Sequence, residues 1–326
     1  MNNSNTSNHS IGQKAHLIRS PLFLNGITRA GKFILGKIVS HIHGVEHFQY
    51  ASLLEHLPFL SGMGLISNNV AINLMRVHLD EHAYNMAIGR NLNFRFDDAS
   101  SLYHSSEINQ YLQRSLENNL PHLLEDYKKS ERLPCFIIHE TMPHINVVFD
   151  AYPQPFIIDL QRHPVDLIYS WYRRGWGGRQ VEDPLSFAPV LGGASSSIPW
   201  YASAWKDRYE KANRMDRIIG SISYLISEGQ RTLKSLTSER RKRICQITYE
   251  KLVTDPQTTV KMLAQFLNRS VEETLSTTLS KEKLPNPNLL EKKADKLNEI
   301  RKESSQEYWE ILECLIADYE QEYEGI

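Results

Sequence analysis

Four short runs of nearly continuous apolar residues restrict the possible folds of this chain more than any other feature. Strands buried on both faces are apolar throughout, whereas strands with one solvent-facing side alternate between apolar and polar residues. The runs therefore predict the strands of a parallel sheet that helices cover on both faces. They comprise Leu22–Leu24, Cys135–Ile138, Phe156–Leu160 and Ile244–Ile247.

Helical patterns separate these runs. Pro164 and Pro256 each suit the first turn of a helix, and Asp255 ahead of Pro256 is typical of an N-cap. Strands that alternate with helices, without an internal repeat, predict a doubly wound α/β domain. The helical stripe that follows the first run consists of Ile34, Leu35, Ile38, Val39 and Ile42.

The remaining segments predict the domain organisation. Residues 1–18 begin with an Asn/Ser-rich stretch that lacks the apolar core of a signal peptide, so we expect a flexible tail and then a single domain over residues 19–326. Residues from about 45 to 130 predict a helical insertion between the first two strands. Residues 175–205, rich in Gly, Ser, Trp and Pro, predict a long loop, and residues 291–322 predict one charged amphipathic helix.

The charge balance and the cysteines argue against several classes of protein. The 37 Lys and Arg residues nearly cancel the 38 Asp and Glu residues, so no overall basic field indicates a nucleic-acid partner. Cys135, Cys245 and Cys314 form neither a zinc pattern nor a disulfide framework. The apolar stretch Pro21–Asn25 is too short to span a bilayer. We therefore expect a cytoplasmic protein without a membrane span or a cysteine-held metal.

A glycine-bearing turn after the first strand is the first functional motif. Glycine lets the backbone approach a phosphate closely, and the helix that follows directs free N–H groups towards the anion. Arg29 and Lys32 add two cations to this turn. The segment therefore predicts a phosphate-binding loop that consists of Gly26, Arg29, Ala30, Gly31, Lys32 and Phe33.

Two phosphate-binding patterns are similar to this loop. Gly26-x4-Gly31-Lys32 matches the P-loop of NTPases except at its last position, where Phe33 lacks the hydroxyl group that holds magnesium. This difference disfavours a P-loop nucleoside or sugar kinase. The loop also resembles the sulfotransferase pattern G-x-x-[K/R]-x-G-T-x-x-L through Gly26, Arg29 and Gly31, although Lys32 and Phe33 stand where that family usually has Thr or Ser.

A more specific resemblance lies after the third strand. Arg162 follows that strand, at the edge where ligands bind in open α/β sheets, and Ser170 lies two helical turns further on, so the guanidinium and the hydroxyl could converge on one phosphate. The stretch Arg162–Ser170 resembles R-[D/H]-P-x-[D/E]-x-x-x-S, the 3′-phosphate-binding motif of sulfotransferases that use PAPS (3′-phosphoadenosine-5′-phosphosulfate). Tyr249–Pro256 resembles the Y-E-x-L-x-x-x-P segment of the same family.

Three motifs, namely the loop and the stretches that begin at Arg162 and Tyr249, together resemble this family from about residue 20 to residue 270. The resemblance implies a three-layer α/β sandwich of the P-loop NTPase-like type, and sulfuryl transfer from PAPS to a hydroxyl or amine, with PAP as the product and no metal. It also implies that Arg162, Ser170 and Tyr249 bind the cofactor together with the loop. The acceptor stays open between a carbohydrate, a lipid and another small molecule. A P-loop kinase and a non-catalytic nucleotide-binding protein remain the alternatives.

By analogy with phosphoryl transfer, sulfuryl transfer needs a cation at the leaving oxygen and a base for the acceptor proton. Arg29 is the first candidate cation by its motif position, and Lys32 is the alternative. The aromatic residues of the predicted loop offer ring faces to an acceptor. They are Trp176, Trp200, Tyr201 and Trp205.

Five residues are candidates for the base. Heparan sulfate 2-O-sulfotransferases and their relatives use a histidine on the strand before the one that carries the R-x-P motif, which by resemblance implies His139, with Glu140 second and His144 third. Other sulfotransferases use a glutamate soon after the phosphate loop. Glu46 and Glu55 are the candidates of that kind.

Overall fold

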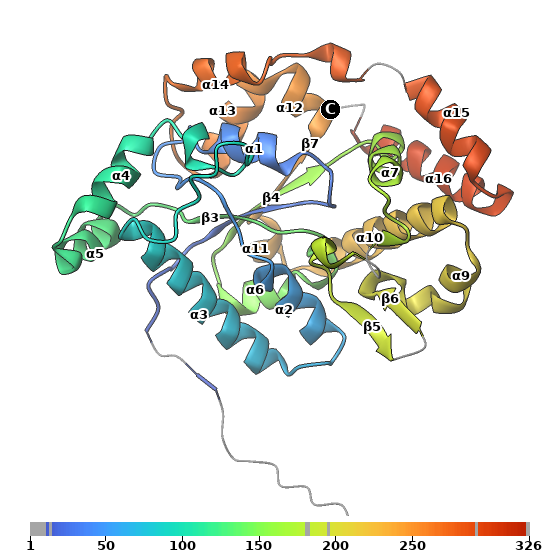
Figure 1. Ribbon diagram of the computed structural model, residues 1–326, viewed down its shortest axis with the longest axis horizontal. Coiled ribbons are helices and arrows are strands. Elements are labelled where there is room, and N and C mark those ends of the chain that lie inside the picture. The colour runs from blue at the N-terminus through green and yellow to red at the C-terminus, as the bar shows by residue number, and fades with distance from the viewer. Residues whose placement is uncertain (1–10, 13–14, 180–182, 194–195, 291–292, 324–326) are drawn as a thin grey trace, which may run out of the picture.

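The computed structural model describes residues 11–12, 15–179, 183–193, 196–290 and 293–323. Most of the predicted tail, residues 1–18, lies outside them, so its flexibility stays a prediction. A five-stranded sheet forms the centre of the molecule, in the order β2-β3-β1-β4-β7, and every pairing within it is parallel (Figure 1). Its strands are β1 (Leu22–Asn25), β2 (Gln49–Tyr50), β3 (Cys135–Ile137), β4 (Phe156–Gln161) and β7 (Ile244–Thr248).

Helices cover both faces of this sheet, which confirms the predicted α/β sandwich (Figure 1). Within β1, Leu22 and Leu24 belong to one buried cluster and Phe23 to the other, because successive side chains of a strand point to opposite faces. This is why the predicted strands are apolar without alternation. The helices on one face are α1 (Lys32–Val39), α12 (Tyr249–Thr254), α13 (Pro256–Phe266) and α14 (Leu275–Lys281), and those on the other are α2 (Leu53–Gly62), α3 (Asn68–Ala87) and α6 (Asn146–Ala151).

A third buried cluster joins helices beyond the end of β4. It packs α7 (Pro164–Arg173) against α10 (Arg214–Ser235) and the C-terminal helices. The prediction of a single helix over residues 291–322 is wrong, because the described part forms two helices, α15 (Lys293–Glu303) and α16 (Gln306–Tyr323). Residues 291–292 lie outside the described residues. The chain turns between the two helices where the Ser305 N–H bonds to the carboxylate of Asp216 on α10.

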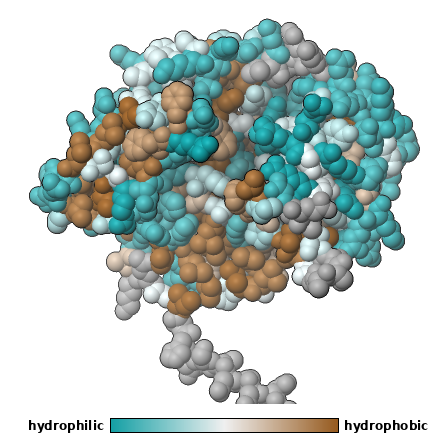
Figure 2. All heavy atoms as spheres, viewed as in Figure 1, coloured by the Kyte–Doolittle hydropathy of each residue, from teal (hydrophilic) through white to brown (hydrophobic). Residues whose placement is uncertain are grey.

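The surface around α15 and α16 is mostly hydrophilic, at the right of Figure 2. Both helices are therefore amphipathic, with apolar residues such as Ile300 and Leu312 turned into the third cluster. Across the described parts of the chain, we find no helix with the length and apolarity that a membrane crossing requires.

The segment between β1 and β3 contains both helices and a strand. Besides α2 and α3 it carries α4 (Ile108–Leu116) and α5 (Leu120–Lys129). The edge strand β2 was not expected from the sequence, because it has only two residues and neither is aliphatic. The backbone of Gln49 and Tyr50 pairs with β3 and thereby brings this segment to the edge of the sheet.

The stretch predicted as a long loop, residues 175–205, is more ordered than expected in its described part. It contains an antiparallel hairpin of β5 (Val190–Gly193) and β6 (Ser196–Pro199), followed by a 3-10 helix over Trp200–Trp205. Residues 180–182 and 194–195 lie outside the described residues. Two further short helices, α9 (Lys206–Lys211) and α11 (Ser238–Arg241), flank α10.

A buried ion cluster fixes the segment that leads into β2. Glu46 is 0% exposed, and its carboxylate pairs with Arg114 at 3.0 Å and with Arg132 at 2.6 Å. Tyr111 donates its hydroxyl to the same carboxylate at 2.6 Å. Burial alone would raise the pKa of Glu46, but the two arginines outweigh it and hold that pKa below its ordinary value. The carboxylate therefore joins α4 to the residues before β3.

Replacing Glu46 with Ala should lower the free energy of unfolding by about 3–5 kcal/mol, since Arg114 would stay buried without its counter-charge and Arg132 would keep only its pair with Glu107. Denaturant unfolding at neutral pH measures this loss. The folded-state pKa of Glu46 is depressed, so the stabilisation exists above the unfolded pKa and disappears as the pH falls through the folded pKa. Glu125→Ala, which removes an exposed pair with Lys129, should cost less than about 1 kcal/mol. Equal losses in the two variants would contradict this assignment.

Candidate functional site

Two glycines determine the path of the loop between β1 and α1. Gly26 has a φ of 149°, and a Cβ there would lie 2.5 Å from the carbonyl oxygen of Leu160. Gly31 has a φ of 110°, and a Cβ there would lie 2.4 Å from the ring of Tyr249. Other residues rarely adopt such φ values, and in both places the neighbouring atoms leave no space for a side chain. The loop can therefore lie directly against β4 and α12.

The side chain of Lys32, at the start of α1, turns back onto this loop. Only 3% of Lys32 is exposed, and its ammonium donates to the carbonyl oxygens of Gly26 at 2.6 Å and Ile27 at 3.0 Å. Burial lowers the pKa of Lys32 to about 8, although the nearby carboxylate of Glu140 acts in the opposite direction. The ammonium thus holds the loop backbone in place. The neighbouring Phe33 packs edge-on against Phe48 at 5.9 Å.

Thr28, at the centre of the loop, is bonded from two sides. Its N–H donates to the carboxylate of Glu140, whose φ is 50°, and its carbonyl accepts from the indole of Trp171 on α7 at 2.7 Å. Trp171 is among the largest fully buried side chains. Sequence reasoning missed this role of Trp171, and its only signal was the aromatic character of the helix that follows Arg162.

Three polar side chains meet beside the loop. The Arg29 guanidinium donates to the hydroxyl of Ser170 at 3.1 Å, and the Arg162 guanidinium donates to the carbonyl of Arg29 at 2.6 Å. Arg162 also lies over the ring of Tyr249, 4.4 Å from its centroid. Burial, followed by the positive charges of Arg174 and Arg162, lowers the pKa of Arg29. The cations thus oppose one another in the free protein, and an anion between them would relieve this repulsion.

An imidazole–carboxylate pair lies across the loop from these arginines. His139 follows β3, and its backbone N–H and Nδ1 both lie against one carboxylate oxygen of Glu55, at 2.9 and 2.8 Å. Tyr50 donates its hydroxyl to the other oxygen at 2.9 Å. Burial opposes ionisation, but the interactions with His139 and Tyr50 hold the pKa of Glu55 below its ordinary value. A carboxylate can only accept, so Nδ1 carries a proton, and Nε2 is the nitrogen left to accept one.

The other three candidate bases have different surroundings. The carboxylate of Glu140 is bonded to the loop, and that of Glu46 is bonded to Arg114 and Arg132. His144 packs against Trp200 at 5.1 Å, and burial lowers the pKa of its imidazole to about 4. The structure therefore places His139 and Glu55 together and Glu46 apart from them.

A cavity of about 720 Å³, partly open to solvent, extends from His139. Phe59 and Trp200 form one of its walls as stacked rings, with centroids 5.2 Å apart. Of the four aromatic residues expected to face an acceptor, Trp176, Trp200 and Tyr201 line the cavity. Trp205 instead packs against Tyr209 and Tyr308. Further lining residues that the sequence did not indicate are Tyr50, Phe59, Phe187 and Pro189.

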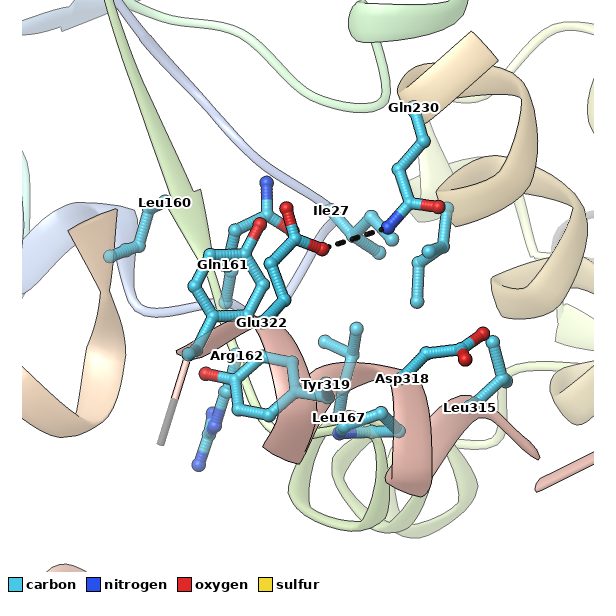
Figure 3. A pocket seen from close by; sticks show the side chains of 14 residues that line it. Ile27, Leu160, Gln161, Arg162, Leu167, Gln230, Leu315, Asp318, Tyr319 and Glu322 are labelled. Carbon is cyan, nitrogen blue, oxygen red and sulfur yellow. Dashed lines mark hydrogen bonds between the residues drawn. The ribbon is translucent and has the colours of Figure 1, made fainter. Parts of the chain in front are cut away.

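A smaller cavity, of about 460 Å³ including open solvent, lies on the other side of the loop, between the end of β4 and α16. Figure 3 shows Asp318 and Glu322 of α16 at this cavity, with Glu322 accepting a hydrogen bond of 3.2 Å from Gln230, while the Arg162 guanidinium points away from these carboxylates. Two acidic side chains make this cavity unsuitable for a phosphate. The helix α16 therefore closes one flank of the loop.

Gly31→Ala should destabilise the protein more than Gly64→Ala does. Gly64 also has a positive φ, of 72°, but a Cβ there would meet nothing within 4 Å, so this variant isolates the backbone cost of about 1–2 kcal/mol. Gly31→Ala adds the displacement of the Tyr249 ring from its place beneath Arg162. Denaturant unfolding compares the two. Equal losses would mean that the loop and α12 are not in contact.

Comparison with known proteins gives the family. The sequence model described as "Sulfotransferase domain" matches residues 19–313, which is most of the chain. No curated protein matches the sequence. Three solved structures are similar to this chain at low sequence identity. The sulfotransferase domain from the curacin biosynthetic pathway has 16% identity and a TM-score of 0.48, with 91% of this chain and 98% of that one covered.

The sulfotransferase from Alicyclobacillus acidocaldarius has 15% identity and a TM-score of 0.41, with 92% of this chain and 96% of that one covered. Mouse sulfotransferase SULT7A1, complexed with PAP, has 14% identity and a TM-score of 0.36, with 81% of this chain and 64% of that one covered. The extent of the family match, from residue 19 to residue 313, decides the assignment. This chain belongs to the sulfotransferase domain family.

Proposed function

We propose that this sulfotransferase takes its sulfuryl group from PAPS and transfers it to a hydroxyl or amine of a small acceptor. The observation that carries the proposal is the meeting of Arg29, Arg162 and Ser170 at the end of β4. Two guanidiniums and a hydroxyl, from the loop and from the stretch Arg162–Ser170, form a compact site for phosphate oxygens. The loop adds the backbone N–H groups at the start of α1.

Each donor-binding residue has a proposed place. Arg162 and Ser170 would hold the 3′-phosphate, and the loop from Gly26 to Phe33, with Ala30 and Gly31 at its close approach, would hold the 5′ end. Tyr249 contacts both Gly31 and the Arg162 guanidinium, so it is suited to the nucleoside between the two phosphate sites. PAPS, when bound, supplies the sulfuryl group and leaves as PAP.

Arg29 and Lys32 have different roles in this proposal. The ammonium of Lys32 is already bonded to two loop carbonyls, so it positions the loop. The Arg29 guanidinium, by contrast, donates to the hydroxyl of Ser170 and, among the described residues, to no loop carbonyl. We therefore assign to Arg29 the stabilisation of the negative charge that develops on the leaving phosphate oxygen.

His139 is the proposed general base. The acceptor oxygen or nitrogen would attack sulfur and form the new bond while the bond from sulfur to the phosphate oxygen breaks, and Nε2 of His139 would take the acceptor proton. Glu55 is a positioning residue, since it holds Nδ1 and stabilises the imidazolium that forms. The cavity beside His139, with its aromatic wall, is where the acceptor would bind.

A cytoplasmic setting is part of this proposal. The three cysteines, all among the described residues, are free thiols, and Cys135 is buried within β3. Free thiols are compatible with a reducing compartment.

Titration calorimetry with PAP tests the donor site. We expect PAP to bind without magnesium, and Arg162→Ala and Ser170→Ala each to weaken binding, by roughly tenfold to a hundredfold for the arginine because a charged hydrogen bond is lost. Arg208→Ala is the matched control, since Arg208 pairs with Glu307 on the surface. Tight magnesium-dependent binding of ATP without a response to PAP would instead favour a P-loop kinase.

His139→Ala should lower kcat by roughly 10²–10⁴-fold while leaving the affinity for PAP unchanged, because general-base catalysis is lost. The measurement is transfer of labelled sulfur from PAPS to the first acceptor found by screening. Glu55→Gln should also lower kcat without changing the KM for PAPS, whereas His144→Ala, the control, should change kcat little. A kcat for His139→Ala close to that of the unmodified protein would exclude His139 as the general base and make Glu140 the next candidate. PAP binding without any turnover would indicate a non-catalytic protein.

A further inference from the structure

A second cavity lies beyond Tyr50, and the proposed reaction does not use it. It measures about 910 Å³, part of which is open solvent, and it lies between α3, the segment before β2, and residues 91–102. Tyr50 lines both this cavity and the one beside His139. The hydroxyl of Tyr50 bonds Glu55, and its ring packs edge-on against His139 at 5.4 Å. The second cavity is thus one side chain away from the proposed base.

His47 lines this cavity, and one of its two imidazole nitrogens lacks a hydrogen-bond partner among the described residues. His47 is 2% exposed, and its Nε2 lies 3.1 Å from the carbonyl oxygen of Ser100. A carbonyl only accepts, so Nε2 carries the proton and Nδ1 is an acceptor. Burial lowers the pKa of His47 to about 4, so the ring is neutral. Nδ1 is buried and has no hydrogen-bond partner among the described residues.

Gln49, two residues further on, offers a second such atom. Its carboxamide oxygen is 3.0 Å from Nδ1 of His82, whereas its buried carboxamide nitrogen has no partner within the described part of the chain. Buried polar atoms are normally hydrogen-bonded, so each exception asks for an explanation. Here two exceptions, one acceptor and one donor, occur on side chains that line the same cavity. Both atoms have almost no accessible surface in the free protein, so a ligand with donor and acceptor groups would bond to them after the two side chains rotate towards the cavity.

The rest of the lining favours a neutral ligand. Among the described residues that line the cavity, Glu81 is the one Asp, Glu, Lys or Arg, and its side chain is exposed. A sulfate or phosphate group would meet no cation there. Asn85, Asn91 and Asn93 add amides, and the apolar remainder includes Phe48 and Leu102. Apolar walls with a few amide and imidazole groups are suited to uncharged molecules that carry hydroxyl or amide groups.

We infer that this cavity is a subsite for an uncharged, hydroxyl- and amide-bearing part of the acceptor, such as a neutral sugar unit. The inference rests on the proposed function, because it makes Tyr50 the boundary between the reacting hydroxyl at His139 and the rest of the acceptor. An acceptor of this class would place its aromatic-stacking part against Trp200 and its polar part beside His47 and Gln49. Anionic acceptors would be excluded from the second cavity.

Ligand-observed NMR on the PAP-saturated protein tests this inference with three matched probes. They are N-acetylglucosamine, its 6-sulfate, and cyclohexanol, which differ in charge and in hydrogen-bonding groups. We expect saturable binding of N-acetylglucosamine and weaker binding of the other two. Gln49→Leu should weaken binding of N-acetylglucosamine by roughly threefold to tenfold through the loss of one hydrogen bond. Gln110→Leu, an exposed glutamine on α4, is the control and should have no effect.

Binding of PAP is measured separately, so the two proposals can fail independently. If PAP binds but N-acetylglucosamine does not saturate, or binds no better than its sulfate ester or cyclohexanol, the subsite is wrong and the donor site stands. If PAP does not bind, the proposed function fails and the acceptor subsite with it. Should Gln49→Leu not fold, the ¹⁵N shift of His47 Nδ1 in the unmodified protein gives the answer. A shift on sugar binding supports the subsite, and an unchanged shift contradicts it.

Discussion

The parallel pairing of β1 with β3 on one side and β4 on the other is the constraint on which the rest of the structure depends. Because Leu24 is level with Ile137 and Ile158, the three strands end at the same edge of the sheet. The loop, His139 and Arg162 each leave their strand at that edge. Three segments that are far apart in sequence thus reach one place without any long connection between them.

Charges are distributed unequally around the loop. On the side of β4, Arg29 and Arg162 stand together without a carboxylate partner in the contacts described above, so that side is suited to an anion. On the side of β3, Glu55 is held by His139 and Tyr50, so that side is suited to a proton transfer. Lys32, between the two, donates hydrogen bonds from its ammonium to two loop carbonyls. The proposed transfer, from an anionic donor to an acceptor that loses a proton, would use both sides.

The two cavities near His139 differ in the chemistry of their walls. The first has stacked aromatic rings, Phe59 and Trp200, and the second has amides and imidazoles. Both depend on segments that lie far from the phosphate motifs: α2, the short strand β2, and the residues after α3. The buried carboxylate of Glu46 holds this region to α4, and Tyr111, which bonds it, also accepts the backbone N–H of His47. A structural ion cluster thus positions a side chain of the second cavity.

The sequence by itself determined the sheet strands β1, β3, β4 and β7 and the loop with its glycines, because these depend on residues adjacent in the chain. Apolar runs, a turn that only glycine accommodates, and a proline in the first turn of a helix are local signals. The placing of Arg162 at a strand end was equally local. What these residues bind stays a proposal, since no local pattern identifies a ligand.

Only the tertiary structure decided which distant residues meet. Glu55 and Glu46 were equal candidates in sequence, yet one pairs with His139 and the other with Arg114 and Arg132, more than sixty positions away. The two-residue strand β2, the hairpin β5–β6 and the division of the C-terminal helix likewise depend on neighbours supplied by the fold. The physical reason is common to all of them: pairing across the fold depends on which segments the sheet brings into contact, and that is not encoded within any short window of sequence.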